Sequence, residues 1–367
     1  MTEAALAARL ACDRTEPDLA LVFVTADAWE TSREVLLRAR QVTGARAVVG
    51  CSGTGVLTER REEEDGPAAA VLTVADPELV ATPFLVEGPA DAGAVELLAA
   101  QVEPTVAGGG CLIVLPDPSG LSPRTLLDGI GRRLGPVPML GAVPAGRPVF
   151  QLYDTEPRRE SLVGVALAGR RPVVGVAQGC MPIGEPYVIT RADRNLVLEI
   201  GSRRALDVLR EAVTATPGGV ERVARAGLFA GIAIDAAKSP LGRGDFLVRS
   251  LLGVDDATGA VALNEVVRVG QTLQFQIRDA AASREDLEEM LGDVARRLDG
   301  RRPRYGCYFN CAGRGRGLFG VRDHDVGVIR ERLGPFPLVG FFGNGEFAPV
   351  GGRNFLHTYT AVLALFP

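Results

Sequence analysis

The residues with the clearest chemical capacity are polar side chains in or beside glycine-rich stretches. Asn310 and Arg314 precede the segment 315–320, and Asn344 and Glu346 lie at the end of a later glycine-rich segment. A small zwitterion such as an amino acid needs this mixture, because its ammonium group requires a carboxylate and its carboxylate requires Arg or backbone N–H groups. The pattern therefore predicts a small-ligand site. Solvation of Arg314 and Glu346, or pairing between them, fits the sequence equally well.

A second polar, glycine-rich stretch lies near the middle of the chain. Residues 178–186 run Gln-Gly-Cys-Met-Pro-Ile-Gly-Glu-Pro and include Gly179, Cys180 and Pro182. We expect a domain junction here, because residues 171–186 are rich in glycine and proline. A loop at this junction would bring a thiol and backbone N–H groups to the ligand.

Three Gly-x-x-x-x-Gly segments occupy residues 50–55, 141–146 and 340–345. This pattern is half of a phosphate-binding loop, whose other half is a Lys-Ser/Thr pair that contacts the phosphates and magnesium. None of the three segments is followed by that pair, and Glu346 after the third would repel phosphate. Nucleotide hydrolysis is therefore disfavoured. Glycines that let a strand reverse at a turn explain each segment equally well.

Other catalytic and cofactor motifs fail at specific positions. Residues 315–320 match the dinucleotide pattern Gly-x-Gly-x-x-Gly, but no acidic residue follows at the required distance of about 20 positions. Ser52 lies in a near match to a nucleophile elbow, but Thr54 replaces its second glycine. His324 and His357 are the only histidines, and neither lies in a catalytic pattern. We therefore predict no catalytic residue, no cofactor and no metal.

The six cysteines indicate a reduced, cytoplasmic protein, since they show no disulfide-framework spacing and no secretory signal precedes them. On one strand, Cys307 and Cys311 would lie roughly 13 Å apart, too far for a disulfide or a shared zinc ion. Cys51, Cys180 and Cys311 lie beside glycine-rich turns. The alternative function is therefore a cysteine-dependent enzyme acting on a small metabolite.

Composition excludes several classes of function. The 367 residues include 40 Lys and Arg against 45 Asp and Glu, so the net charge is −5. That balance gives no general positive field for nucleic acid or for anionic membranes. Hydrophobic residues make up 47%, which is typical of a folded protein with a large core. No run of 18 apolar residues occurs, so we expect no membrane-spanning helix.

The elements that must position these residues recur along the chain. A strand, a helix, a short second strand and a glycine turn are predicted three times, over residues 19–55, 111–146 and 305–345. Returning strands are predicted near 68–74, as the pair 149–153 and 162–167, and near 358–366.

The alternation of strands and helices predicts an α/β (α+β) fold. We expect mixed β-sheets flanked by helices, in two similar halves built from repeated strand-helix-strand-glycine-turn units. Two predicted helix starts are well marked, because Ser122 precedes Pro123, and because Ser283 with Asp286 fits a capping pattern for a helix over 283–298.

These motifs resemble the FIST family, named for F-box and intracellular signal transduction proteins. Residues 47–55 resemble the FIST N-terminal domain, and residues 178–186 and 338–346 resemble the FIST C-terminal domain. The resemblance implies an N-terminal domain over residues 19–170 and a C-terminal domain over residues 171–367. It also implies a sensory module that binds small ligands such as amino acids.

We therefore expect an intracellular sensor, not an enzyme, that acts on a separate signalling output protein and binds neither nucleic acid nor membrane. The ligand site is expected to combine the glycine turns with the 178–186 junction. Its expected residues are Cys51, Ser52, Gly53, Gly179, Cys180, Pro182, Asn310, Cys311, Arg314, Phe342, Asn344 and Glu346.

Overall fold

The computed structural model describes residues 4–5, 7–8, 16–88, 91–119 and 122–367, and these form two compact units. The first unit comprises Met1–Val176, Met290–Leu356 and Thr360–Pro367. The second comprises Ala177–Glu289 with His357–Tyr359. The units do not divide at residue 170, because the third copy of the repeat packs with the first two copies.

Each copy of the repeat in the first unit contains a parallel pair of strands joined through a helix. The pairs are β1–β2, β7–β8 and β20–β21. The first copy consists of β1 (Leu19–Thr25), the short helix η1 (Ala26–Ala28), α2 (Ser32–Thr43), β2 (Ala47–Gly53), β3 (Val56–Thr58), β4 (Glu62–Glu63) and β5 (Ala69–Val74). The second consists of β6 (Val80–Glu87), α3 (Ala92–Val106), β7 (Gly110–Pro116), α4 (Pro123–Leu134), β8 (Met139–Ala142), β9 (Gln151–Tyr153), β10 (Glu156–Arg158) and β11 (Ser161–Ala168). The third consists of β20 (Tyr305–Cys311), α8 (Arg316–Phe319), α9 (His324–Leu333), β21 (Leu338–Gly343), β22 (Glu346–Val350), β23 (Arg353–His357) and β24 (Ala361–Phe366), and β12 (Val173–Ala177) joins its sheet.

The copies are interlocked, because the hairpin after each glycine turn pairs with the sheet of another copy. β3 follows β2 but pairs with β21, β9 follows β8 but pairs with β2, and β22 follows β21 but pairs with β8. Among the described residues, the resulting sheets have the orders β10-β9-β2-β1-β5, β23-β22-β8-β7-β11-β6 and β12-β24-β20-β21-β3-β4. Each exchanged hairpin covers a strand that would otherwise be an exposed edge.

This exchange corrects two sequence predictions. The chain does not simply reverse at the glycine turns, because it passes there from one sheet to the next. The strands predicted as a pair, near 149–153 and 162–167, correspond to β9 and β11 in different sheets. Local sequence specifies a turn, whereas the partner of the following strand depends on which edge lies nearby.

The first glycine of each turn segment is required by close approach of two strands. A Cβ at Gly50, Gly141 or Gly340 would overlap a carbonyl oxygen of the neighbouring strand β1, β7 or β20. The turn explanation holds for the second glycines Gly146 and Gly345, whose φ values are 106° and 101°.

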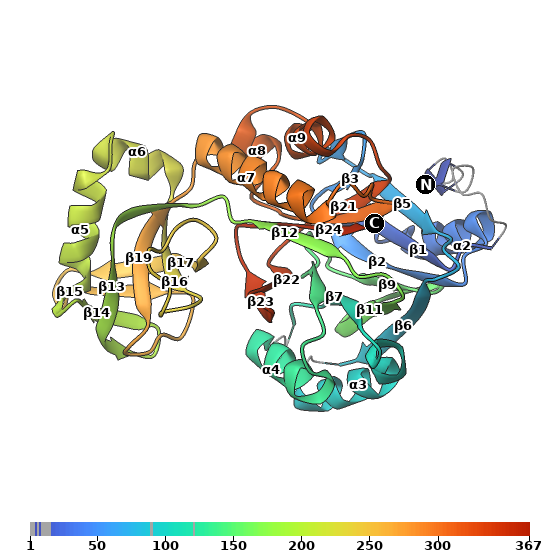
Figure 1. The fold of residues 1–367 in the computed structure, drawn as a ribbon, viewed down its shortest axis with the longest axis horizontal. Helices are drawn as coiled ribbons and strands as arrows, with labels where there is room; N and C mark the ends of the chain where they lie inside the picture. The colour runs from blue at the N-terminus through green and yellow to red at the C-terminus, as the bar shows by residue number, and fades with distance from the viewer. Residues whose placement is uncertain (1–3, 6, 9–15, 89–90, 120–121) are drawn as a thin grey trace. The chain divides into compact units, whose positions relative to one another are not determined.

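One hydrophobic core joins the three sheets of the first unit. Phe23 of β1 packs against Phe341 of β21, with ring centroids 4.8 Å apart, and against the edge of Phe309 of β20 at 6.5 Å. The opposite face of β1 packs with Leu36 and Ala39 of α2 in a separate cluster. In Figure 1, α3 and α4 lie together beside β6, β7 and β11.

The second unit is an antiparallel sheet that closes on itself. Its described strands have the order β13-β19-β16-β17-β18-β14-β15, and β13 also pairs with β14. Helices α5 and α6 lie along this sheet (Figure 1) and contribute apolar residues to its core. The elements are β13 (Met181–Asp193), β14 (Leu196–Ile200), β15 (Arg203–Arg204), α5 (Ala205–Ala215), α6 (Gly219–Ala226), β16 (Leu228–Ala233), β17 (Phe246–Asp255), β18 (Ala260–Leu263), β19 (Thr272–Ile277) and the start of α7 (Ala280–Leu298).

The predicted fold class is confirmed, since mixed sheets and helices build an α+β fold. The start of α4 is also as predicted, because Ser122 Oγ accepts a hydrogen bond from Thr125 N at 3.4 Å. Helix α7 begins at Ala280, before the predicted start at Ser283, and Asp279 Oδ1 accepts a hydrogen bond from Ala282 N at 2.8 Å. The predicted junction loop is largely strand, formed by β12 and the beginning of β13.

Candidate functional site

The three glycine turns meet in the first unit. Ser52 Oγ accepts a hydrogen bond from Phe150 N at 3.1 Å and donates one to Ala145 O at 3.2 Å, which joins the first turn to the second. Asn344 N donates to Val143 O at 2.8 Å, which joins the third turn to the second. The predicted residues that the turns contain are Cys51, Ser52, Gly53, Phe342 and Asn344, and Glu346 follows the third turn directly. The Ser52 hydroxyl is used as both donor and acceptor, so it fastens the turns together.

Burial limits the chemistry of two predicted residues near the turns. Cys51 is fully buried, and this burial raises the pKa of its thiol well above the ordinary value. The nucleophilic thiolate is therefore disfavoured there, which argues against a catalytic Cys51. Glu346 is also fully buried, and its Oε2 accepts hydrogen bonds from Thr360 Oγ1 at 2.5 Å and Thr360 N at 3.3 Å. The backbone of Cys311 is held nearby, since Cys311 N donates a hydrogen bond to Thr360 O at 3.1 Å. The side chain of Asn344, in contrast to those of Cys51 and Glu346, is exposed.

Asn310 and Arg314 belong to a buried polar cluster around Asp325. Arg314 Nε and Nη2 donate to the two oxygens of Asp325 at 2.9 and 3.1 Å, and both side chains are fully buried. Tyr308 Oη and Asn310 Nδ2 donate to Asp325 Oδ2 at 2.9 and 3.2 Å, and His324 Nδ1 lies 2.8 Å from Oδ1. Burial opposes ionisation of Asp325, but the Arg314 guanidinium outweighs it and lowers the pKa of this carboxyl group. This bidentate ion pair ties the turn that follows β20 to the start of α9.

Glu62 of β4 adjoins this cluster and has no counterpart among the predicted residues. Its Oε1 accepts a hydrogen bond from Val326 N at 2.9 Å, and its own N donates to Asp323 Oδ1 at 2.6 Å. Burial, and next the Asp325 carboxylate, raise the pKa of Glu62 to about 8. A run of three glutamates at 62–64 is typical of a solvated face, so the burial of Glu62 is not evident from sequence.

The remaining predicted residues, Gly179, Cys180 and Pro182, belong to the second unit, where the chain enters β13. Asp286 Oδ2 accepts a hydrogen bond from Gly179 N at 2.8 Å, and Ser283 Oγ donates to Gly179 O at 2.8 Å. These two α7 side chains, expected to cap the helix, instead anchor the backbone beside Cys180.

Strand β19, which pairs with β13, carries polar side chains on one face. Its other face contributes to the hydrophobic core of the unit, through Leu273, Phe275 and Ile277. Because side chains alternate along a strand, Gln274, Gln276 and the following Arg278 lie on the opposite face. These three side chains are only 8%, 1% and 8% exposed. The alternating sequence is typical of a strand with one solvated face, so the burial of this polar face is not evident from sequence.

The amides of this face are incompletely hydrogen-bonded. Neither the nitrogen nor the oxygen of the Gln276 side chain has a hydrogen-bond partner. Gln274 Nε2 donates to Gly184 O at 2.7 Å, but Gln274 Oε1 has no partner. Leaving a buried polar group unpaired costs about 1–3 kcal/mol, and native proteins pair most such groups. An unsatisfied amide at this depth marks a position where a molecule that donates and accepts hydrogen bonds would bind favourably.

Aromatic and apolar groups surround Gln276. In the strand register, Pro182 of β13 and Phe229 of β16 lie directly on either side of it. The Tyr359 ring packs on Phe229 with centroids 4.4 Å apart, and the Arg278 guanidinium lies 5.4 Å from the centroid of the Tyr359 ring. We call this set the glutamine face, and it comprises Pro182, Phe229, Gln274, Gln276, Arg278 and Tyr359.

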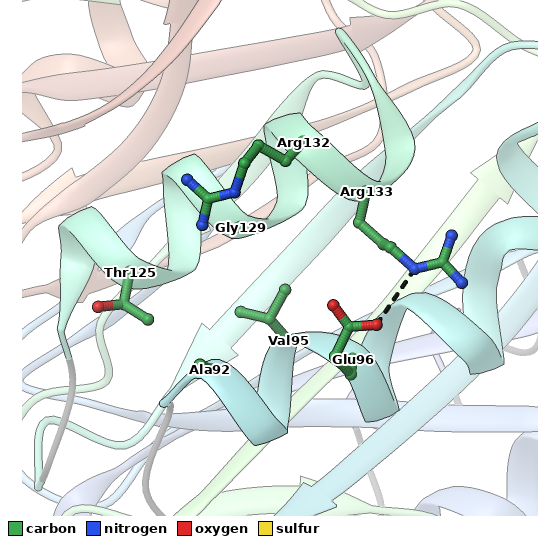
Figure 2. Close-up of a pocket in the computed structure, with 7 residues that line it drawn as sticks. All are labelled: Ala92, Val95, Glu96, Thr125, Gly129, Arg132 and Arg133. Atoms are coloured by element: carbon green, nitrogen blue, oxygen red, sulfur yellow. Dashed lines mark hydrogen bonds and ion pairs between the residues drawn. The ribbon is translucent and has the colours of Figure 1, made fainter.

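A shallow groove of about 130 Å³ lies between α3 and α4 of the first unit (Figure 2). Its lining residues are Ala92, Val95, Glu96, Thr125, Gly129, Arg132 and Arg133. Arg133 Nε is hydrogen-bonded to Glu96 Oε2 at 3.2 Å across the groove. The groove contains none of the predicted site residues and no unsatisfied buried group, so the glutamine face is the stronger candidate.

Comparison with models of known protein families identifies the family of this chain. A model of the FIST N domain matches residues 18–203, and a model of the FIST C domain matches residues 205–349. The chain belongs to the FIST family. FIST domains are sensory domains of signal transduction. The two matches meet near residue 204, inside the second compact unit, so each matched FIST domain contributes to both units.

Relatives of this FIST protein occur in mycobacteria. It is 37% identical over 368 residues to an uncharacterized protein of Mycobacterium tuberculosis (strain ATCC 25618 / H37Rv), with 99% of this chain and 95% of the relative covered. It is also 37% identical over 354 residues to an uncharacterized protein of Mycobacterium bovis (strain ATCC BAA-935 / AF2122/97), with 95% of this chain and 90% of the relative covered. These similarities extend over both compact units.

Among the described helices of this FIST protein, none is both long and apolar enough to cross a membrane. Within the described residues, no group of three or more His, Cys, Asp or Glu side chains is arranged to hold a metal ion.

Proposed function

We propose that this FIST protein is a cytoplasmic sensory module that binds a small ligand, an amino acid or a related metabolite, at the glutamine face. The observation that carries the proposal is the Gln276 side chain, which is 1% exposed and has no hydrogen-bond partner for either amide atom. In this proposal, Arg278 supplies positive charge for a ligand carboxylate, and the rings of Phe229 and Tyr359 supply apolar contact.

The predicted site residues divide into two groups under this proposal. Cys180 and Pro182 lie at or next to the glutamine face, since Pro182 pairs with Gln276 across the β13–β19 ladder. The residues of the first unit hold its scaffold together, as illustrated by the ion pair of Arg314 with Asp325. The signal then passes to a separate output protein.

Thermal-shift measurements with amino acids and related metabolites test the proposal. We expect at least one compound to raise the melting temperature of the wild-type protein, because a ligand that binds only the folded state stabilises it. The shift should disappear in Gln276→Met and persist in Gln101→Met, a control on the exposed face of α3. A broad library without a single Gln276-dependent shift would contradict the proposal.

A further inference from the structure

The chemistry of the glutamine face narrows the kind of ligand that fits it. A glutamine side chain offers one acceptor oxygen and two N–H donors in a single plane. In Gln276 the oxygen and the nitrogen are both buried and without partners, so its complement must donate one hydrogen bond and accept another. A primary carboxamide has this edge, and it would form two parallel hydrogen bonds with Gln276.

Neighbouring groups of the strand set the other features of the ligand. Residues two apart along a strand lie roughly 7 Å apart on the same face. Gln274 Oε1 therefore provides a further acceptor on one side of Gln276, and the Arg278 guanidinium provides positive charge on the other side.

Gly231 of β16 provides the space that the Gln276 amide occupies. A Cβ on Gly231 would overlap Gln276 Nε2, so glycine on β16 gives the amide room against the neighbouring backbone. Replacement by alanine would displace the Gln276 amide without removing it. This provides a second way to disturb the same recognition.

From these contacts we propose that the ligand carries a primary carboxamide edge, bound by Gln276, together with an anionic group directed toward Arg278. The inference rests on the proposed function and specifies its ligand class. Amino acids with a carboxamide side chain satisfy both requirements. Their acidic counterparts have almost the same shape but replace the amide N–H donors with a second acceptor oxygen, which would face the Gln276 oxygen unfavourably.

Two matched ligand pairs test this inference in the full-length protein, by calorimetric titration and thermal shift. The pairs are L-glutamine with L-glutamate and L-asparagine with L-aspartate. We expect at least one amide to bind, with an affinity about 10-fold or more above that of its acidic partner, because the acid cannot satisfy the buried amide oxygen. The difference should be lost in Gln276→Met and reduced in Gly231→Ala, and retained in Gln101→Met.

The possible outcomes separate this inference from the proposed function. Equal binding of an amide and its acid, or amide binding unchanged in both Gln276→Met and Gly231→Ala, would overturn the inference. If other amino acids bind in a Gln276-dependent manner while both amides fail, the inference is wrong and the proposed function stands. If no amino acid or related metabolite binds, both are wrong. The comparison within each ligand pair uses the wild-type protein, so it decides the inference even where a variant fails to fold.

Discussion

Replacement of Gln276 by methionine should stabilise the ligand-free protein, contrary to the usual effect of a core substitution. Methionine is unbranched and similar in size to glutamine, so it fills the same space between Pro182 and Phe229. The substitution removes a buried amide whose two polar atoms have no partner. An unpaired buried polar group costs about 1–3 kcal/mol, so the free energy of unfolding should rise by about that amount.

Gln178→Met is the matched control for this prediction. Gln178 is also buried, at 3% exposure, but its Nε2 donates a hydrogen bond to Phe246 O. Methionine at this position would leave that carbonyl unpaired and cost about 1–3 kcal/mol. The same chemical change is therefore expected to shift stability in opposite directions at the two glutamines.

Urea denaturation and thermal melting of the wild-type protein, Gln276→Met and Gln178→Met measure these changes. A change of 1 kcal/mol in the free energy of unfolding corresponds to a shift in melting temperature of roughly 4 °C for a domain the size of the second unit. The linear slope of the urea titration should stay constant, so that the midpoint alone reports stability. If Gln276→Met lowers stability as much as Gln178→Met does, the Gln276 amide is satisfied within the folded protein, and the reasoning that places a ligand there fails.

Four further predictions concern the first unit. Stability should fall as the pH rises from about 4.5 to about 8, because folded Glu62, with its pKa raised to about 8, keeps a proton that the unfolded chain has released. Urea titrations across that pH range should show a flatter dependence of stability on pH for Glu62→Gln than for the wild-type protein. Arg314→Met should cost about 3–5 kcal/mol of unfolding free energy, because it leaves a buried carboxylate without its ionic partner, and an unchanged urea midpoint would exclude that role. Gly340→Ala should prevent stable folding, because the added Cβ overlaps a backbone oxygen, and soluble yield and circular dichroism measure this. Gly131→Ala, in an open part of α4, should instead raise the free energy of unfolding by about 0.5–1 kcal/mol. Cys51 should resist iodoacetamide at pH 7.5 in the folded protein and react in urea, as followed by mass spectrometry; rapid labelling of the folded protein would contradict its burial and raised pKa.

Several features of the fold follow from local sequence. The three repeated units and the helix start at Ser122 are evident there, because hydrophobic periodicity, capping residues and turn glycines act over a few neighbouring positions. The exchange of hairpins among the three sheets is not evident, because any of several strand edges satisfies the backbone hydrogen bonds of β3, β9 or β22. The choice among edges depends on the packing of all three copies.

The candidate site likewise combines features that are evident from local sequence with features that depend on tertiary packing. The sequence by itself identified the polar, glycine-rich stretch that contains Cys180 and Pro182, and it supplied the FIST resemblance that the family comparison confirmed. It gave no sign of Gln276, since glutamine alternating with apolar residues is typical of a solvated strand face. Only the tertiary structure shows that this face is buried, with Pro182 of β13 and Phe229 of β16 on either side of Gln276 and Tyr359 packed on Phe229. Burial of a side chain is decided by what packs over it from distant parts of the chain, and for Gln276 that packing turns an ordinary polar residue into the candidate centre of recognition.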